Sequence, residues 1–266
     1  MIDLLTQQTL REQYNPEGSS LRRLQLQMLD ILIEFDRICQ KHQIPYWLDA
    51  GTLLGAVRHG GFIPWDDDLD ICMSRRDYDR FRQVCVDELA APYKLRDVGA
   101  ADNNYSYWAK IVDETVVVRR KLTNPTRILQ YNIWLDIFVV ESGSVDTKRR
   151  IEPIYGKCLR RKNKQIIDGR LNYILAILFL PIINGGIRLL RLWNRVAHKD
   201  EYIYTYGVPF YPKHLKEYTF PLSSISFEGH RFCAPSNPDG YLRTFYGDYE
   251  SIPSVEKRIT HDFMLD

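Results

Sequence analysis

Four acidic residues fall within five consecutive positions of this 266-residue chain. They are Asp66, Asp67, Asp68 and Asp70. Carboxylates about 4 Å apart repel one another by roughly 4 kcal/mol at an effective dielectric constant of about 20. A fold keeps such a group together only where water, protons or a divalent cation relieves the repulsion. The acid-rich stretch, residues 49–73, therefore predicts a metal and phosphate site.

The spacing of the acids indicates which of them bind the metal. From Asp68 to Met73 acidic and apolar residues alternate, which is typical of a half-buried strand. Asp68 and Asp70 would then leave the same face of this strand, while the apolar residues enter the core. Paired carboxylates of this kind suit Mg²⁺, which also binds substrate phosphates. Asp66 and Asp67 are interpreted as turn residues or as supports for the metal ligands.

Two alternative interpretations of the acid-rich stretch remain open. A calcium loop has the DxDxD spacing of Asp66, Asp68 and Asp70, but its sixth position requires Gly, and this chain has Ile71 there. The second alternative is a solvated acidic turn without a ligand. The apolar residues that alternate with the acids weigh against a turn that is merely solvated.

A Gly-Thr step lies where a short predicted strand meets a predicted helix. Residues 45–48 favour a strand and residues 52–58 a helix, so Gly51 and Thr52 fall at the helix N-terminus and Asp49 at the end of the strand. Backbone N–H groups and the helix dipole bind anions at such a junction. Many Gly-Thr pairs are only turns, but this one closely precedes the acid pair. Gly51 and Thr52 are therefore candidate phosphate-binding residues.

A third acid is isolated in an apolar segment. Asp136 is the one charged residue between Ile133 and Val140, a run with the pattern of a buried strand. A lone buried carboxylate costs several kcal/mol unless it is paired with a cation. If this strand lay beside the acid pair, Asp68, Asp70 and Asp136 could hold two metal ions and stabilise an in-line displacement at phosphorus. Exposure of Asp136 at a strand end is the alternative.

Three basic residues are further candidates for phosphate binding. Arg58 and His59 follow the Gly-Thr helix, and a surface position is the alternative for both. Lys110 lies within a predicted strand and would pair with a phosphate if it faced the site. Trp47, Trp65 and Trp108 could pack against a base or choline methyl groups, although core packing is the simpler interpretation for each.

The composition is that of an ordinary globular protein, with 45% hydrophobic and 26% charged residues. Five scattered cysteines without zinc spacing predict reduced thiols in a cytoplasm, and no signal peptide is expected. The net charge of +2 conceals a basic block, because residues 148–199 hold 13 Lys and Arg and only two acids. Its apolar run, 173–183, is shorter than the roughly 20 residues that span a bilayer. Residues 171–195 therefore predict either contact with a membrane interface or a helical hairpin packed on the core.

The order of elements predicts one mixed α/β domain over residues 1–266. We expect a core over 20–145, a helical basic and apolar insertion over 146–200, and an aromatic, turn-rich C-terminal segment over 201–266 that wraps the rest. Residues 1–18 are expected to form a loosely held arm. In the core, an amphipathic helix capped by Ser20 and a second helix opening at Ser74 are expected, together with strands over 93–98, 105–112, 115–121 and 133–140.

Three motifs resemble the LicD family, with fukutin-type proteins as more distant relatives. They are GTLLGAVRHGGFIPWDDDLDICMSRRDYDRF from Gly51, WAKI at 108–111 and WLDIF at 134–138, and a C-terminal pattern that includes YGDY at 246–249 and His261 also resembles the family. The resemblance spans roughly residues 20–261 and implies a nucleotidyltransferase-like fold. Its Gly-Ser/Thr step, acid-x-acid strand and later single acid map onto Gly51-Thr52, Asp68/Asp70 and Asp136. One departure is Val139-Val140-Glu141, where the family usually has Pro-Leu-Asp.

The resemblance implies a transferase that depends on Mg²⁺ or Mn²⁺. It would move a phospho-alcohol group, such as phosphocholine, from a CDP-activated donor to a cell-surface glycan or lipid-linked glycan precursor, as in modification of lipopolysaccharide, teichoic acid or capsule. A cytoplasmic location, with peripheral membrane contact through 148–199 at the inner face, is expected, and no nucleic-acid partner. The alternatives are a nucleotidyltransferase that uses an NTP and an inactive member that binds glycans or membranes.

Overall fold

A mixed sheet built around one long strand, β5 (Ile128–Ser142), organises the fold. The computed structural model describes residues 2–97, 107–121, 128–163, 169–198, 200–258 and 263–265. The sheet also contains β1 (Trp47–Leu48), β2 (Asp70–Ser74), β3 (Tyr93–Arg96), β4 (Ala109–Lys121), β6 (Glu201–Tyr204), β7 (His214–Leu215) and β10 (Phe263–Leu265). The expected mixed α/β class is confirmed.

The pairing of β2 with β5 is parallel, whereas every other strand pair of the described chain is antiparallel. In the β2–β5 register Asp70 lies beside Asp136, and on the other side of β5 Lys110 of β4 lies beside the same Asp136. The sequence predicted two strands where β4 is continuous. The register shifts between Val112 and Val117, and Asp113 accepts the Thr115 N–H, so a bulge absorbs the turn-like residues without ending the strand.

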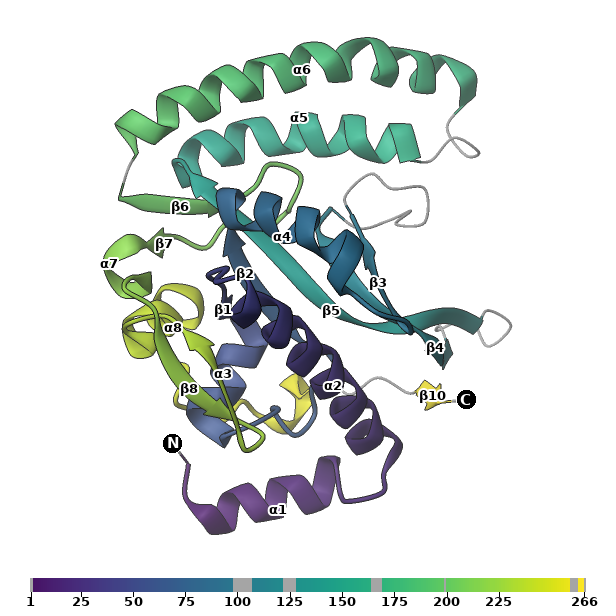
Figure 1. Cartoon of the computed structure of the whole chain (residues 1–266), viewed down its shortest axis with the longest axis vertical. Helices are drawn as coiled ribbons and strands as arrows, with labels where there is room; N and C mark the ends of the chain where they lie inside the picture. The colour runs from purple at the N-terminus through teal and green to yellow at the C-terminus, as the bar shows by residue number, and fades with distance from the viewer. Residues whose placement is uncertain are drawn as a thin grey trace.

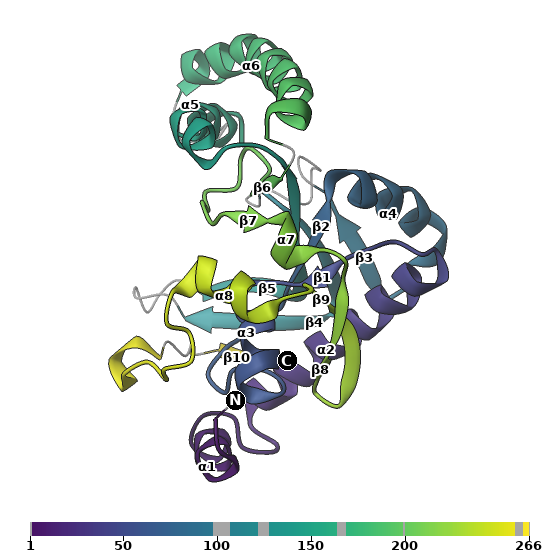
Figure 2. The same cartoon turned by 90° about the vertical axis from the view of Figure 1, so that its left-hand side faces the viewer.

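Two amphipathic helices, α2 (Ser20–Lys41) and α4 (Arg75–Glu88), cover one face of the sheet (Figure 2). Their apolar faces meet at Phe35 and Phe81, whose ring centroids lie 4.8 Å apart. The predicted cap of α4 at Ser74 is confirmed, since its hydroxyl accepts the Asp77 N–H. The cap of α2 is Ser19 and not Ser20, so that boundary was wrong by one residue.

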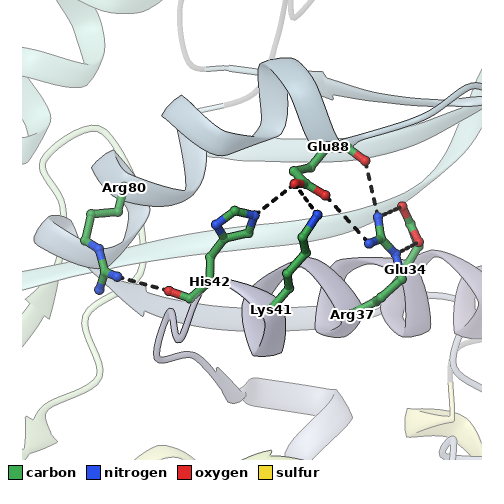
Figure 3. A network of polar contacts seen from close by, with 6 residues as sticks. All are labelled: Glu34, Arg37, Lys41, His42, Arg80 and Glu88. Atoms are coloured by element: carbon green, nitrogen blue, oxygen red, sulfur yellow. Dashed lines mark hydrogen bonds and ion pairs between the residues drawn. The ribbon is translucent and has the colours of Figure 1, made fainter.

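Polar contacts at the surface fasten the end of α4 to the end of α2 (Figure 3). Lys41 Nζ lies 2.6 Å and His42 Nε2 3.1 Å from a Glu88 carboxylate oxygen, and both interactions lower the pKa of Glu88. Arg37 donates to the Glu88 carbonyl, and Arg80 donates to the His42 carbonyl. The two helices are therefore joined at their ends as well as through their apolar faces.

The N-terminal segment, expected to be a loose arm, forms helix α1 (Leu4–Tyr14). Asp3 caps it by accepting the Thr6 N–H, and Leu10 is buried. Gln7 contacts His59 at 2.6 Å. The polar sequence concealed this helix because tertiary contacts, and not a broad apolar face, hold it in place.

A helical hairpin of α5 (Val145–Asn163) and α6 (Gly169–Ala197) stands beyond one end of the sheet (Figure 1). Helix α6 continues through Pro181 and Gly185-Gly186 without a break. Proline in a helix interior removes a hydrogen bond and crowds the preceding turn, and packing of α6 against α5 offsets that cost. In the described part of the chain, no helix has both the length and the apolar character needed to cross a bilayer.

The C-terminal segment runs back along the core. After β7 it forms α7 (Lys216–Thr219), a hairpin of β8 (Ser223–Phe227) and β9 (His230–Ala234), and α8 (Pro238–Tyr246), followed by a 3-10 turn at Val255–Lys257. Helix α8 lies across the sheet from α2 and α4 (Figure 2) and packs on α3 (Ala50–His59).

A fully buried acid joins this C-terminal segment to the core. Asp49 follows β1, as expected, and caps α3. Its carboxylate also accepts the hydroxyl groups of Tyr204 at 2.6 Å and Tyr241 at 2.8 Å. The Tyr241 oxygen in turn accepts the Trp47 indole N–H. Burial raises the pKa of Asp49, and the two tyrosine hydrogen bonds oppose that rise.

We expect Asp49→Ala to lower the free energy of unfolding by about 3 kcal/mol or more. The loss of a helix cap costs about 1 kcal/mol and each buried hydroxyl left without an acceptor about 1–3 kcal/mol. Urea denaturation would measure the change, with Asp87→Ala on the exposed side of α4 as the control. Equal stability of the two variants would contradict this account.

Candidate active site

A row of charged side chains crosses the middle of the sheet. Asp70 on β2, Asp136 on β5 and Lys110 on β4 are register neighbours, and adjacent strands lie about 4.8 Å apart. Lys110 Nζ lies 2.7 Å from Asp136 Oδ1 and stacks 3.7 Å above the Trp134 ring. Two acids and a base thus lie side by side across the sheet, and all three residues were predicted from the sequence as site residues.

The ionised forms of Asp70 and Asp136 are disfavoured at these positions. Burial, then the carboxylates of Asp136 and Asp68, raise the pKa of Asp70 well above its usual value. Burial also raises the pKa of Asp136, against the opposing effect of Lys110. A divalent cation between the carboxylates would relieve this repulsion, because it replaces a proton as the neutralising charge.

Asp68 lies just before the strand, and not on it as the alternation had predicted. Strand β2 begins at Asp70, and Asp68 belongs to the exposed loop before it. Leu69 between them is fully buried, and its carbonyl accepts the Asp136 N–H at 2.8 Å, so the chain is already tied to β5 there. Asp68 still lines the same cleft as Asp70 and Asp136.

The acids before the strand also converge. Carboxylate oxygens of Asp66, Asp67 and Asp68 lie within 4.8 Å of one another, a spacing that could hold a metal ion. Burial and the two neighbouring acids raise the pKa of Asp66 to about 8. The sequence placed Asp66 and Asp67 in a turn or in a supporting position, and the structure puts them within reach of a shared cation.

The Gly-Thr step lies at the N-terminus of α3, beside these acids. A Cβ on Gly51 would lie 2.8 Å from Asp66 Oδ2, so the glycine leaves room for that carboxylate. Thr52 is buried, and its hydroxyl accepts the Asp70 N–H at 2.8 Å. Thr52 thus fixes the first residue of β2, a positioning contact that the sequence did not reveal.

Arg58 and His59 do not reach the cleft. Both are 5% exposed at the far end of α3. Arg58 donates to His59 Nε2 and to the carbonyls of Tyr249 and Ser251. Burial lowers the pKa of His59 to about 3, so this ring stays neutral. Arg58 therefore joins α3 to the C-terminal segment, and His59 joins it to α1.

The cleft above the acids has a volume of about 620 Å³ and aromatic walls. Its aromatic lining residues are Trp108, Phe138, Tyr204, Phe210, Tyr211, Phe245 and Tyr246. All but Trp108 and Phe138 come from the C-terminal segment, which the sequence analysis did not connect with the site. The signal available was the abundance of aromatic residues between 202 and 249.

Helix α5 holds one wall of the cleft in place. Lys148 is fully buried and donates to the Phe210 carbonyl at 2.8 Å. Glu152, one turn later, accepts the Gly207 N–H with both carboxylate oxygens, at 3.1 and 3.0 Å. Burial lowers the pKa of Lys148 to about 8. The helical hairpin thereby positions residues 205–212.

The fold and the cleft together are typical of proteins that bind a metal ion and a phosphate group side by side. A mixed α/β sheet aligns two acids on a parallel strand pair, and a helix N-terminus faces further acids beside them. Such an arrangement can bind divalent cations and phosphate groups in one cleft.

Comparison with known proteins shows what the chain is similar to. Residues 43–149 match the family model LicD/FKTN/FKRP, nucleotidyltransferase domain. The chain is 29% identical over 259 residues to lipopolysaccharide cholinephosphotransferase LicD of Haemophilus influenzae, covering 91% of this chain and 96% of that protein. The expected resemblance to the LicD family is thereby confirmed, with the domain match confined to residues 43–149.

Two further proteins are similar to this chain over shorter stretches. An uncharacterised protein of Rickettsia typhi is 38% identical over 71 residues, which are 27% of this chain and 23% of that protein. Human ribitol 5-phosphate transferase FKRP is 46% identical over 41 residues, 15% of this chain and 8% of that protein.

Thr52→Val should uncouple β2 from α3 without changing side-chain shape. The buried Asp70 N–H would lose its acceptor, at a cost of about 1–3 kcal/mol in unfolding free energy, and Mn²⁺ affinity should fall because Asp70 is no longer fixed. Thr52→Ser retains the hydroxyl and serves as the matched control. Urea denaturation and Mn²⁺ titration would measure both effects, and equal Mn²⁺ affinity of the Val and Ser variants would refute the positioning role.

Proposed function

We propose that this protein is a metal-dependent transferase of a phospho-alcohol group, such as phosphocholine, from a CDP-activated donor to a glycan hydroxyl. The observation that carries the proposal is the register of Asp70 beside Asp136 on parallel strands, in a cleft that Asp68 also lines. The similarity to proteins named for transfer of cholinephosphate and ribitol 5-phosphate supports the reaction class.

The residues of the cleft fit Mg²⁺ or Mn²⁺. The available ligands are carboxylate oxygens, which both ions prefer. Asp68, Asp70 and Asp136 would hold the metal. Burial, and then the neighbouring carboxylates, raise the pKa of Asp70, and a bound cation would oppose both effects. When bound, the metal would neutralise the donor diphosphate and polarise the phosphorus under attack.

The remaining groups are assigned to binding and proton transfer. The N-terminus of α3 at Gly51 would lie against the diphosphate. Lys110 pairs with Asp136 at 2.7 Å. If Asp136 bound a cation instead, the Lys110 ammonium group would be available to bind a phosphate. Asp136 would accept the proton of the acceptor hydroxyl, and displacement at the phosphorus that carries the alcohol would release CMP.

The aromatic walls suit the two ends of such a donor. Trp108 and Phe210, with ring centroids 5.9 Å apart, offer flat faces on which a base can stack. A quaternary ammonium group binds aromatic faces through cation–π attraction, and Tyr246 presents a further ring near the acids. The cleft therefore accommodates both a base and a choline-like alcohol.

The outer face of α6 supports peripheral contact with a membrane. Its inner side packs Ile187 against Ile203 and Tyr206. The outer side exposes Leu178, Phe179, Ile182, Leu189, Leu192, Trp193 and Val196, each by more than half. Exposed apolar side chains on a helix within a basic segment are typical of interfacial helices. We infer that this face rests on an anionic membrane, close to a lipid-linked acceptor.

The reaction can be tested by incubating the protein with Mg²⁺ and CDP-choline, CDP-glycerol or CDP-ribitol and measuring CMP. We expect one donor to yield CMP, and Asp70→Asn and Asp136→Asn to lower the rate by at least about 100-fold. Asp87→Asn, outside the cleft, should leave it unchanged. Release of pyrophosphate from an NTP, or Mg²⁺ and nucleotide binding unaffected by both substitutions, would overturn the proposal.

Membrane contact can be measured by sedimentation with anionic vesicles at low salt. Trp193→Ala should weaken binding by about tenfold, because the lost burial of an indole in the interface is large. Val86→Ala, which removes an 82% exposed apolar side chain from α4, is the matched control. Absence of binding by the unaltered protein would refute the inferred membrane contact.

A further inference from the structure

A second cavity, of about 520 Å³, lies at the opposite end of the same two strands. Its floor is formed by Ser74 at the end of β2 and by residues 140–142 at the end of β5. Its sides are the first turn of α4 and the last turns of α6. Four of its lining side chains are arginines, namely Arg75, Arg76, Arg191 and Arg195.

Two of these arginines are held rigidly by internal contacts. Glu141 is 7% exposed, and its carboxylate lies 2.7 Å from Arg191 Nε and 3.8 Å from Arg75 Nε. The Thr205 hydroxyl accepts hydrogen bonds from Arg75 at 2.8 Å and from Arg191 at 3.1 Å, and donates to Glu141. One acid thus fixes two guanidinium groups, which leaves a positive charge in excess.

The other two arginines extend this excess. Arg76 and Arg195 are exposed, and among the described residues neither has an ion-pair partner. The cavity also contains Asp79. Four arginines therefore face two acids, and the remaining two positive charges match a phosphate dianion. The N-terminus of α4, a 14-residue helix, adds its dipole to the same space.

We propose that this arginine cavity binds a phosphate group of the acceptor substrate. Guanidinium groups recognise phosphate through paired, charge-assisted hydrogen bonds. Ser74 and Asp70 are four residues apart on β2, so the cavity lies roughly 13 Å along the strand from the reacting acids. The assignment to the acceptor rests on the proposed function, whereas binding of phosphate does not.

Two sources of phosphate share this chemistry, a soluble sugar phosphate and a lipid phosphate. Arg191 and Arg195 alternate along α6 with Leu192, Trp193 and Val196 of the outer apolar face. The cavity consequently opens beside the surface that we assign to the membrane, and a phosphate at the end of a lipid could reach it.

The test uses pyrophosphate as a soluble probe, titrated calorimetrically into the full-length protein in the presence of EDTA, so that no metal can carry it to the acids. We expect saturable binding that the double variant Arg76→Gln/Arg195→Gln weakens by about tenfold or more. Arg188→Gln removes an exposed charge from the same helix outside the cavity and should leave the affinity unchanged. Equal affinity of all three proteins, or no saturable binding, would overturn the proposal.

Vesicles that contain phosphatidic acid distinguish the two sources. If the double variant loses vesicle binding relative to Arg188→Gln, the cavity accepts lipid phosphate; if only pyrophosphate binding falls, it accepts a soluble phosphate. Asp136→Asn should bind pyrophosphate like the unaltered protein. Retained pyrophosphate binding without CMP release from any donor would remove the proposed function and leave this phosphate site standing.

Discussion

The parallel pairing of β2 with β5 is the constraint on which the rest of the structure depends. It places the half-buried Asp70 and the buried Asp136 in adjacent register positions, where the charge of Asp136 disfavours ionisation of Asp70. Fixed contacts around the two residues hold them in place despite that repulsion. Thr52 and the Leu69 carbonyl secure the main chain of the two strands, and Lys110 supplies a positive charge. These contacts fix the positions of both carboxylates.

Local sequence patterns predicted the parts of this arrangement that short-range chemistry determines. The isolation of Asp136 in an apolar run required a partner, and the structure places two charged residues beside it. The helix after Gly51 was equally clear from the sequence, because a glycine at position 60 ends it. In the structure Gly60 has a φ of 69°, in the left-handed region. Asp68 was expected on the strand because the alternation of acidic and apolar residues begins in the loop before β2, where Leu69 already bonds to β5.

Long-range contacts account for what the sequence did not reveal. Arg58 and His59 resembled phosphate ligands in the sequence, yet their partners lie in α1 and near residue 250, and no local pattern records such pairings. Most aromatic residues of the cleft walls, from Tyr204 to Tyr246, lie 68 or more residues beyond Asp136 in the chain. Helix α6 similarly continued through Pro181 because packing outweighs a local propensity.

The anchoring of the cleft wall by α5 has a consequence for how the lining of the cleft can change. Lys148 and Glu152 hold the wall through the carbonyl of Phe210 and the N–H of Gly207, which are main-chain atoms common to almost any sequence. Side chains at 209–212 can therefore be exchanged without releasing the wall from its support. A scaffold of this kind allows the shape of the cleft to change by a few substitutions, while Asp70 and Asp136 stay in place on their strands.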